Sequence, residues 1–321
     1  MLEKPSQINK LGDRLRKSSP IEHRDLMTLL EYRAGFADVL LPSIQQIKGL
    51  LRKDEYISGR IKNAGTIVEK LIRTKYRLVT MIDIAGIRIV SHEGGRKRQE
   101  EISDKIEECA AFRLIQRKDL RETPVHGYRA IHLHVKFEGK LVEVQIRSVF
   151  QHKWASLFER FADLVGRGIR YGEDAEKKLV GTKEEKFETD EVVEQMKQLS
   201  DRIWGQERQQ IEPGEDILCE MNAFFEVLKK ASRRKSESSV ASIGSSVMGP
   251  LFLLKYSRKK GQVEEMEPIS SKELQEKWKK YEENVKSFDD EETVLLAADS
   301  IDAMKKTHDR YFTKFPGLDV F

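Results

Sequence analysis

The chain has 321 residues and a formal net charge of +4, with 35% of its residues charged and 39% hydrophobic. This length allows two domains, or one domain with large helical additions, and the modest net charge does not demand a nucleic-acid partner. No apolar run approaches the roughly 20 residues needed to cross a bilayer, and the N-terminus lacks the apolar core of a signal peptide. Cys109 and Cys219 are too few for a zinc site or a disulfide framework. These features predict a cytoplasmic protein with no membrane partner.

The N-terminal segment, residues 1–52, is predicted to be helical. Apolar residues recur at helical spacing between Leu26 and Leu40. Pro42 is expected to end this helix, because proline lacks the N–H that a helix interior requires, and a second helix follows. A shorter helix is expected from Thr66 to Lys75.

After these helices, the apolar residues alternate by twos, which is typical of strands. A helix over residues 98–110 is expected between the first two strands. A tight turn at residues 137–140 predicts that the last two strands form an antiparallel hairpin. An apolar stripe over residues 149–165 predicts a helix that packs on the sheet. The four expected strands are residues 82–91, 112–119, 128–137 and 140–149.

The next part of the chain is predicted to be a charged helical extension, residues 172–235. Within it, residues 172–190 are expected to be a mobile segment or linker, and residues 191–233 to be helical with an interruption near Pro213. Residues 236–249 are rich in Ser and Gly, which is typical of a flexible linker.

The C-terminal part, residues 250–321, is expected to form a small α/β unit. A strand is predicted over residues 251–256 and a helix over residues 272–286. A second, buried strand is expected over residues 293–298, followed by a helix that Ser300 would cap.

Two of the predicted strands each carry one carboxylate among apolar residues. Asp83 lies near the start of the first strand, and Glu143 lies inside the fourth. A lone aspartate in a Val/Ile-rich strand requires a polar partner if it is buried. Carboxylates on neighbouring strands that are surrounded by Arg and Lys can hold Mg²⁺ and a polyphosphate. The pattern therefore indicates nucleotide chemistry.

A glycine-bearing loop over residues 59–65 precedes the short helix and the first carboxylate. The N-terminus of a helix offers free N–H groups and a positive dipole end to phosphate. Arg60, Lys62 and Lys70 add positive charge on the same side. An ordinary basic loop explains this segment about as well when it is taken alone, and the proximity of Asp83 favours the phosphate interpretation.

Four motifs in this order resemble the RelA/SpoT alarmone synthetase domain. They are Arg60-x-Lys62 with Thr66 and Lys70, then Asp83 to Arg88, then Gly127 to His132, then Glu143 to Arg147 followed by Trp154. The resemblance implies an α+β fold, with a nucleotidyltransferase-like mixed β-sheet flanked by helices. The expected divisions are an N-terminal helical segment (1–52), the synthetase core (53–171), the charged helical extension (172–235), the linker (236–249) and a small, regulatory C-terminal unit (250–321).

The resemblance also implies an activity, that of a GTP diphosphokinase-type pyrophosphotransferase. Such an enzyme transfers the β,γ-pyrophosphate of ATP to the 3′-hydroxyl of GDP or GTP and makes (p)ppGpp in stringent-response signalling. Mg²⁺ would be the cofactor and ATP the pyrophosphate donor. The resemblance implies Mg²⁺ ligation and catalysis by Asp83 and Glu143, with Glu143 as general base. It implies ATP binding by Arg60, Lys62, Lys70 and Arg88, with Arg60 and Arg88 on either side of adenine. It implies acceptor binding by Tyr128, His132 and Gln145.

One segment departs from the family pattern. Members usually have Lys-Pro-Asn before the Gly-Tyr pair, whereas this chain has Pro124, Val125 and His126 there, so the basic residue and the asparagine are missing. These positions bear on the acceptor nucleotide. Two alternatives therefore stay open. One is a toxin or phage-defence relative that pyrophosphorylates the 3′ end of tRNA and blocks translation; the other is a catalytically inactive nucleotide- or RNA-binding regulator.

Overall fold

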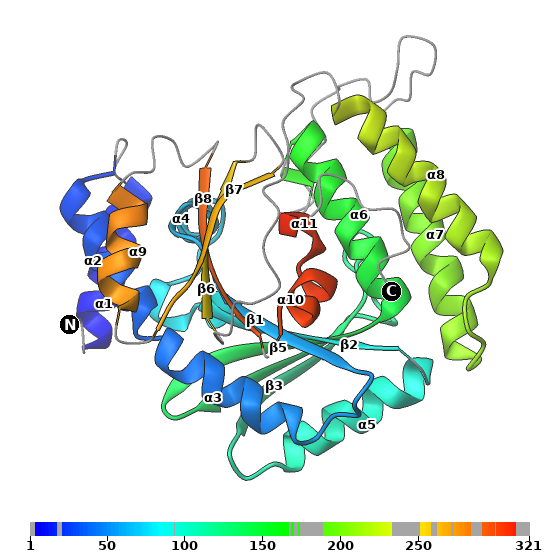
Figure 1. Ribbon diagram of the computed structural model, residues 1–321, viewed down its shortest axis with the longest axis horizontal. Coiled ribbons are helices and arrows are strands. Elements are labelled where there is room, and N and C mark those ends of the chain that lie inside the picture. Colours follow the sequence, from blue (N-terminus) through cyan, green and yellow to red (C-terminus); the bar gives the residue numbers. More distant parts are fainter. Residues whose placement is uncertain are drawn as a thin grey trace.

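The structure, a computed structural model, describes residues 4–17, 21–92, 94–166, 168–169, 173, 189–232, 251–257, 262–270, 273–283, 291–298 and 300–312. Its centre is one mixed sheet in the order β3-β4-β5-β2-β1-β8-β6-β7, with helices on both faces (Figure 1). Among the described helices, none is long and apolar enough to span a membrane. The α+β class expected from the sequence is confirmed.

Three helices precede the first strand, and strands and helices follow singly or in runs of up to three. The strands are β1 (Tyr56–Ile61), β2 (Ala85–Ser91), β3 (Arg113–Asp119), β4 (Ile131–Phe137), β5 (Lys140–Ser148), β6 (Leu251–Ser257), β7 (Gln262–Pro268) and β8 (Glu291–Ala298). The helices are α1 (Pro5–Lys17), α2 (His23–Ala34), α3 (Ala37–Lys48), α4 (Ala64–Arg73), α5 (Gly95–Glu108), α6 (Val149–Val165), α7 (Thr189–Arg208), α8 (Glu215–Ser232), α9 (Leu274–Glu283), α10 (Ile301–Thr307) and α11 (Asp309–Phe312), with 3₁₀ turns η1 (Leu78–Thr80) and η2 (Ile82–Ile84).

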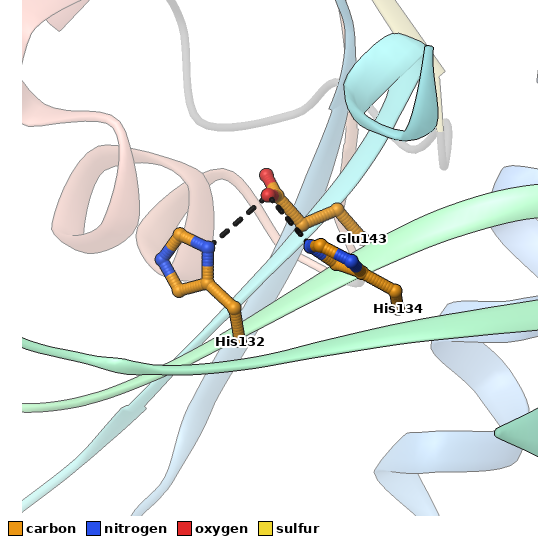
Figure 2. A group of neighbouring side chains, drawn as sticks. All are labelled: His132, His134 and Glu143. Carbon is orange, nitrogen blue, oxygen red and sulfur yellow. Dashed lines mark hydrogen bonds and ion pairs between the residues drawn. The ribbon is translucent and has the colours of Figure 1, made fainter. Parts of the chain in front are cut away.

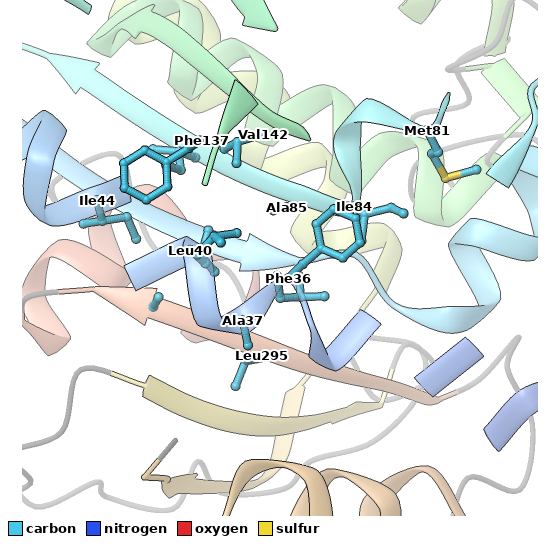
Figure 3. Packing of buried hydrophobic residues seen from close by; sticks show 14 of the residues in the cluster. Phe36, Ala37, Leu40, Ile44, Met81, Ile84, Ala85, Phe137, Val142 and Leu295 are labelled. Atoms are coloured by element: carbon cyan, nitrogen blue, oxygen red, sulfur yellow. The ribbon is translucent and has the colours of Figure 1, made fainter. Parts of the chain in front are cut away.

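One face of the central strands is apolar and packs against α3 and α5. Val142 and Phe137 of the sheet belong to the same buried cluster as Leu40 and Ile44 of α3 (Figure 3). Gly59 of β1 allows this close approach, because a Cβ there would lie 2.7 Å from Leu40 Cδ1. The helices on this side leave the opposite face of the strands available for polar side chains.

The structure corrects three of the local predictions. Pro42 does not end the helix but lies inside α3, where burial of Leu40, Ile44 and Ile47 on the sheet outweighs the missing hydrogen bond. The strand predicted over residues 82–91 is β2, which begins at Ala85 and not at residue 82, because residues 82–84 form the turn η2. Residues 59–61, expected in a glycine-bearing loop, belong to strand β1.

Several other local predictions are confirmed. The hairpin of β4 and β5 turns at Glu138 and Gly139, whose φ angles of 45° and 82° suit a two-residue turn. Helix α6 matches the predicted range of 149–165. The helix expected from Thr66 to Lys75 is present as α4, two residues earlier at each end, and it begins at Ala64 because the side chain of Asn63 caps it by accepting from the Thr66 N–H.

Helices α7 and α8 form a hairpin that packs against α6. Their break at residues 209–214 includes Pro213, as the sequence predicted. Most of the expected mobile segment, 172–190, and the whole expected linker, 236–249, lie outside the described residues.

The C-terminal strands extend the central sheet and do not form a sheet of their own. Strand β8 pairs antiparallel with β1, and β6 pairs with β8 on its other side. Trp278 of α9 is fully buried, and the guanidinium of Arg33 from α2 lies 4.5 Å from its ring centroid. Ser300 caps α10, as the sequence predicted. Strands β6 and β8 and helix α9 thus contribute to the same core as the N-terminal helices.

Candidate functional site

The second face of the central strands is polar, and the strand register gathers the predicted residues on it. Arg88 of β2 lies opposite Gln145 of β5, and Gln145 lies opposite His132 of β4. Side chains on one strand return to the same face every second residue, so Glu143 joins this group, and Arg60 joins it from β1 through its pairing with Gly86. The parallel pairing of β2 with β5 places Arg88, predicted to bind ATP, next to Gln145, predicted to bind the acceptor nucleotide.

Asp83 lies in the turn η2, immediately before β2. The ammonium of Lys62 is 2.6 Å from Asp83 Oδ2, and that of Lys70 is 2.8 Å from the same oxygen. Lys62 directly follows β1, and its N–H donates to the carbonyl of Ile84 at 2.8 Å, which ties the two segments together. Asp83 Oδ1 is buried and has no hydrogen-bond partner within the part of the chain that the structure describes.

Opposing charges decide the ionisation of these groups. Burial raises the pKa of Asp83, but the charges of Lys62 and Lys70 outweigh it, and the pKa lies below its ordinary value. The charge of Glu143 acts on the pKa of Asp83 in the opposite direction, so the two carboxylates lie within electrostatic reach of each other. Burial lowers the pKa of Lys62, although the charge of Asp83 opposes this.

Glu143 is surrounded by two histidines and an amide. His132 Nδ1 lies 3.1 Å and His134 Nε2 lies 3.7 Å from Glu143 Oε1 (Figure 2). Gln145 Nε2 donates to Glu143 Oε2 at 2.8 Å. Burial raises the pKa of Glu143, but the charge of His132 and these contacts hold it well below its usual range. Burial lowers the pKa of His132, but Tyr128 and Glu143 outweigh this and raise it to about 9. At neutral pH the two residues form a charged pair.

Tyr128 connects the acceptor-side residues predicted from the sequence. Its hydroxyl lies 2.8 Å from His132 Nε2 and accepts a hydrogen bond of 2.8 Å from Arg147. The Arg147 guanidinium lies 4.8 Å from the ring centroid of Tyr128, so one face of the ring is occupied. Arg147 also donates to Gln145 Oε1 at 3.0 Å. Gly127 precedes this tyrosine with a φ of 86°, which glycine adopts without strain.

Helix α10 packs against β1 and β2 on this same side of the sheet, and α11 follows it (Figure 1). Arg88 is buried and donates to the carbonyl of Thr307 at 2.6 Å, and Arg60 lies 3.4 Å from the hydroxyl of Tyr311. Asp309 anchors the segment to α6 by accepting from Ser156 at 2.8 Å and Arg160 at 3.2 Å. The two arginines predicted to hold adenine are therefore in contact with the C-terminal helices.

Three residues of this face have no predicted role in the sequence analysis. They are His134 beside Glu143, Arg147 on Tyr128, and His152, whose Nε2 lies 2.9 Å from the Lys306 carbonyl. Burial and the charge of Arg88 lower the pKa of His152 to about 3, so its ring is neutral. His134 and Arg147 each lie two residues from a predicted site residue, and that alternation is the signal that would have found them.

A scan against protein-family models finds one match to this chain, over residues 59–160, to the family described as "Region found in RelA / SpoT proteins". Two curated relatives are the uncharacterized proteins Rv1366 of Mycobacterium tuberculosis and Mb1401 of Mycobacterium bovis. Each is 36% identical over 126 residues, which is 39% of this chain and 46% of the relative. The match thus spans about half the length of these relatives.

Solved structures similar to this chain include two proteins of Bacillus subtilis. Small alarmone synthetase 1 is 19% identical and is matched over 60% of this chain and 95% of its own, with a TM-score of 0.44. Small alarmone synthetase 2 is 20% identical over 58% and 94%, with a TM-score of 0.41. Similarity at this level supports no inference about activity. Residues 59–160 thus match the region found in RelA and SpoT proteins, and the four motifs singled out in the sequence lie within this match.

Proposed function

We propose that this protein is an ATP-dependent pyrophosphokinase that transfers the β,γ-pyrophosphate of ATP to the 3′-hydroxyl of GDP or GTP. The observation that carries the proposal is the position of Asp83, which lies between two lysines and within electrostatic reach of Glu143. Phosphoryl-type transfer depends mainly on positioning and on charge neutralisation, and this site concentrates both kinds of charge.

The carboxylates fit a hard divalent cation such as Mg²⁺. Asp83 Oδ1 is a buried acceptor with no partner among the described residues, and a cation would satisfy it. Asp83 and Glu143 would hold the ion, which when bound neutralises charge on the polyphosphate and polarises the phosphorus under attack. The low pKa of Glu143 means that it is ionised but weakly basic, which favours cation binding over proton abstraction while His132 stays protonated.

The basic residues would bind and orient ATP. Lys62 and Lys70 neutralise Asp83 in the present arrangement, and phosphate oxygens of ATP would replace this carboxylate as their partner. Arg60 and Arg88 belong to adjacent strands and share one face, which suits two guanidinium groups that stack on a purine. On the acceptor side, the ring of Tyr128 would stack on the base, with His132 and Gln145 beside it.

We further propose that residues 301–312 restrict access of ATP to this site. The contacts of Arg88 with Thr307 and of Arg60 with Tyr311 occupy the two side chains that adenine would need. Removing residues 250–321 would be a poor test, because it would also remove β8 from its place beside β1. Weakening the anchor at Asp309 is the better test.

The reaction can be tested with the full chain, γ-³²P-ATP and Mg²⁺, with GDP, GTP and deacylated tRNA offered separately. We expect label to move to a guanine nucleotide, and to be lost in both Asp83→Asn and Glu143→Gln. Label on tRNA would replace the proposed acceptor with the 3′ end of tRNA, an outcome that the altered segment before Gly127 favours. Activity retained in either variant would overturn the metal-ligand assignment. If label moves to none of the three acceptors, even in a variant whose anchor at Asp309 is weakened, the remaining interpretation is a nucleotide-binding regulator.

A further inference from the structure

The surroundings of Glu143 differ from those of a site built for Mg²⁺ alone, because they contain two imidazoles. Strand pairing places His134 directly opposite Glu143, and His132 two residues earlier on the same face of β4. Among the described residues, one nitrogen from each histidine and one oxygen of Glu143 all lie within 4.8 Å of one another. Figure 2 shows both rings turned toward the carboxylate.

We propose that His132, His134 and Glu143 form a binding site for a transition-metal dication of the Zn²⁺ or Co²⁺ class. Imidazole nitrogen suits such ions, whereas Mg²⁺ prefers oxygen. Metal–ligand bonds of about 2.0–2.2 Å in tetrahedral geometry place neighbouring ligand atoms about 3.3 Å apart. The observed separations of 3.1 Å and 3.7 Å from Glu143 Oε1 lie on either side of this value. Binding would displace the proton that His132 carries in its pair with Glu143, because a metal ligates neutral imidazole. The three protein ligands would leave a fourth position for water or substrate.

The burial and the hydrogen bonds of these residues support a built site. The side chains of His132, His134 and Glu143 are 13%, 6% and 13% exposed. His134 faces the site with Nε2, which lies 3.7 Å from Glu143 Oε1, while its Nδ1 is buried without a hydrogen-bond partner in the part of the chain that the structure describes.

The outer contacts are those that orient metal ligands. Nε2 of His132 lies 2.8 Å from the Tyr128 hydroxyl, which leaves Nδ1 directed at the site. Gln145 donates to Glu143 Oε2 and thereby keeps Oε1 directed at the histidines. These two contacts orient His132 and Glu143 whether or not the protein catalyses the proposed transfer. Metal binding at this site therefore does not depend on the proposed function.

The ion would compete with the proposed Mg²⁺ for Glu143, which makes transfer sensitive to transition metals. The effect on transfer rests on the proposed function. The metal site itself is tested by metal binding, which needs no transfer activity. Asp83 belongs to the Mg²⁺ assignment but not to this one, so Asp83→Asn separates the two sites.

The test is titration of the metal-free full chain with Co²⁺, followed by its visible d–d absorption, with Zn²⁺ added afterwards as competitor. We expect one intense, tetrahedral-type spectrum per chain, which Zn²⁺ abolishes and excess Mg²⁺ does not. His134→Gln should weaken Co²⁺ binding by more than about tenfold, since loss of even an outer partner costs that much. His23→Gln, which alters an exposed histidine on α2, should bind Co²⁺ as the wild type does, and Asp83→Asn should keep the tetrahedral-type spectrum because Asp83 is not a proposed ligand of this ion.

His132→Gln gives a second, independent removal of a ligand if His134→Gln does not fold, as judged by circular dichroism. Equal Co²⁺ affinity in the wild type and in a folded ligand variant would overturn the proposal. A weak, octahedral-type spectrum that His23→Gln reduces would do the same, because it would place the ion on surface histidines.

Discussion

We predict that buried Glu207 makes the free energy of unfolding fall as the pH rises through neutrality. This residue of α7 is 2% exposed, and its carboxyl accepts hydrogen bonds from the Ser148 hydroxyl and, at 2.7 Å, from Gln151 Nε2. Burial outweighs these hydrogen bonds and raises its pKa from 4.5 to about 7. Between these two values the folded chain keeps a proton that the unfolded chain has released. Stability contributed by this group is therefore complete below pH 4.5 and is lost as the pH rises through about 7.

The size of the effect follows from the shift. Each pKa unit corresponds to 1.36 kcal/mol, so the folded state should lose about 3 kcal/mol of stability from this group by about pH 8. Glu207→Gln removes the titration but keeps a side chain of the same shape, which can accept from Gln151 and donate to Ser148. Relative to wild type, the variant should gain about 1.4 kcal/mol per pH unit across this window and then reach a plateau.

The assay is urea unfolding followed by tryptophan fluorescence, at intervals of about one unit from about pH 5 to about pH 8. Glu212→Gln provides the matched control, because Glu212 is exposed and lies just beyond the same helix. The comparison between variants cancels every other titrating group. A constant difference between Glu207→Gln and wild type across this range would refute the reasoning, because the carboxyl would then titrate alike in both states.

Two further predictions concern the site. Tyr128→Ala should lower kcat/KM for the acceptor by about 5- to 150-fold, which corresponds to a lost base stack of ~1–3 kcal/mol, and should leave the KM for ATP unchanged. A change confined to the KM for ATP would place the ring on the donor side. Asp309→Asn should weaken the charged contact with Arg160 and raise ATP binding by about tenfold or more, measured by equilibrium titration of a non-hydrolysable ATP analogue. Asp302→Asn, on the exposed side of α10, is the control, and equal affinity in Asp309→Asn and wild type would argue against the restrictive role of residues 301–312.

Local pattern predicted a large part of the fold. Alternation by twos located β3, β4 and β5 to within three residues at either end, and the apolar stripe located α6. Prediction failed where packing overrode a local rule. Pro42 is tolerated in α3 because the apolar face of that helix is buried, and the start of β2 is displaced because η2 holds Asp83 against two lysines.

The site was predictable only in part, because the sequence does not show which residues are neighbours across the sheet. Motifs in the sequence pointed to Asp83, Glu143 and the basic residues, and period-two alternation indicated which side chains share a face. His134 was overlooked because a single histidine in a strand has no distinctive pattern until its neighbour across the sheet is known. That neighbour is Glu143, and the pairing of β4 with β5 supplies it.

The sequence by itself determined the alternation, the turns and the caps, because these depend on residues a few positions apart. The tertiary structure alone decided that β8 lies beside β1 and that α10 and α11 contact Arg60 and Arg88. These contacts join residues more than 200 positions apart. Their stability comes from burying apolar surface shared between distant segments, such as Ile57, Leu253 and Leu295 in one cluster, and no local pattern specifies which segments will meet.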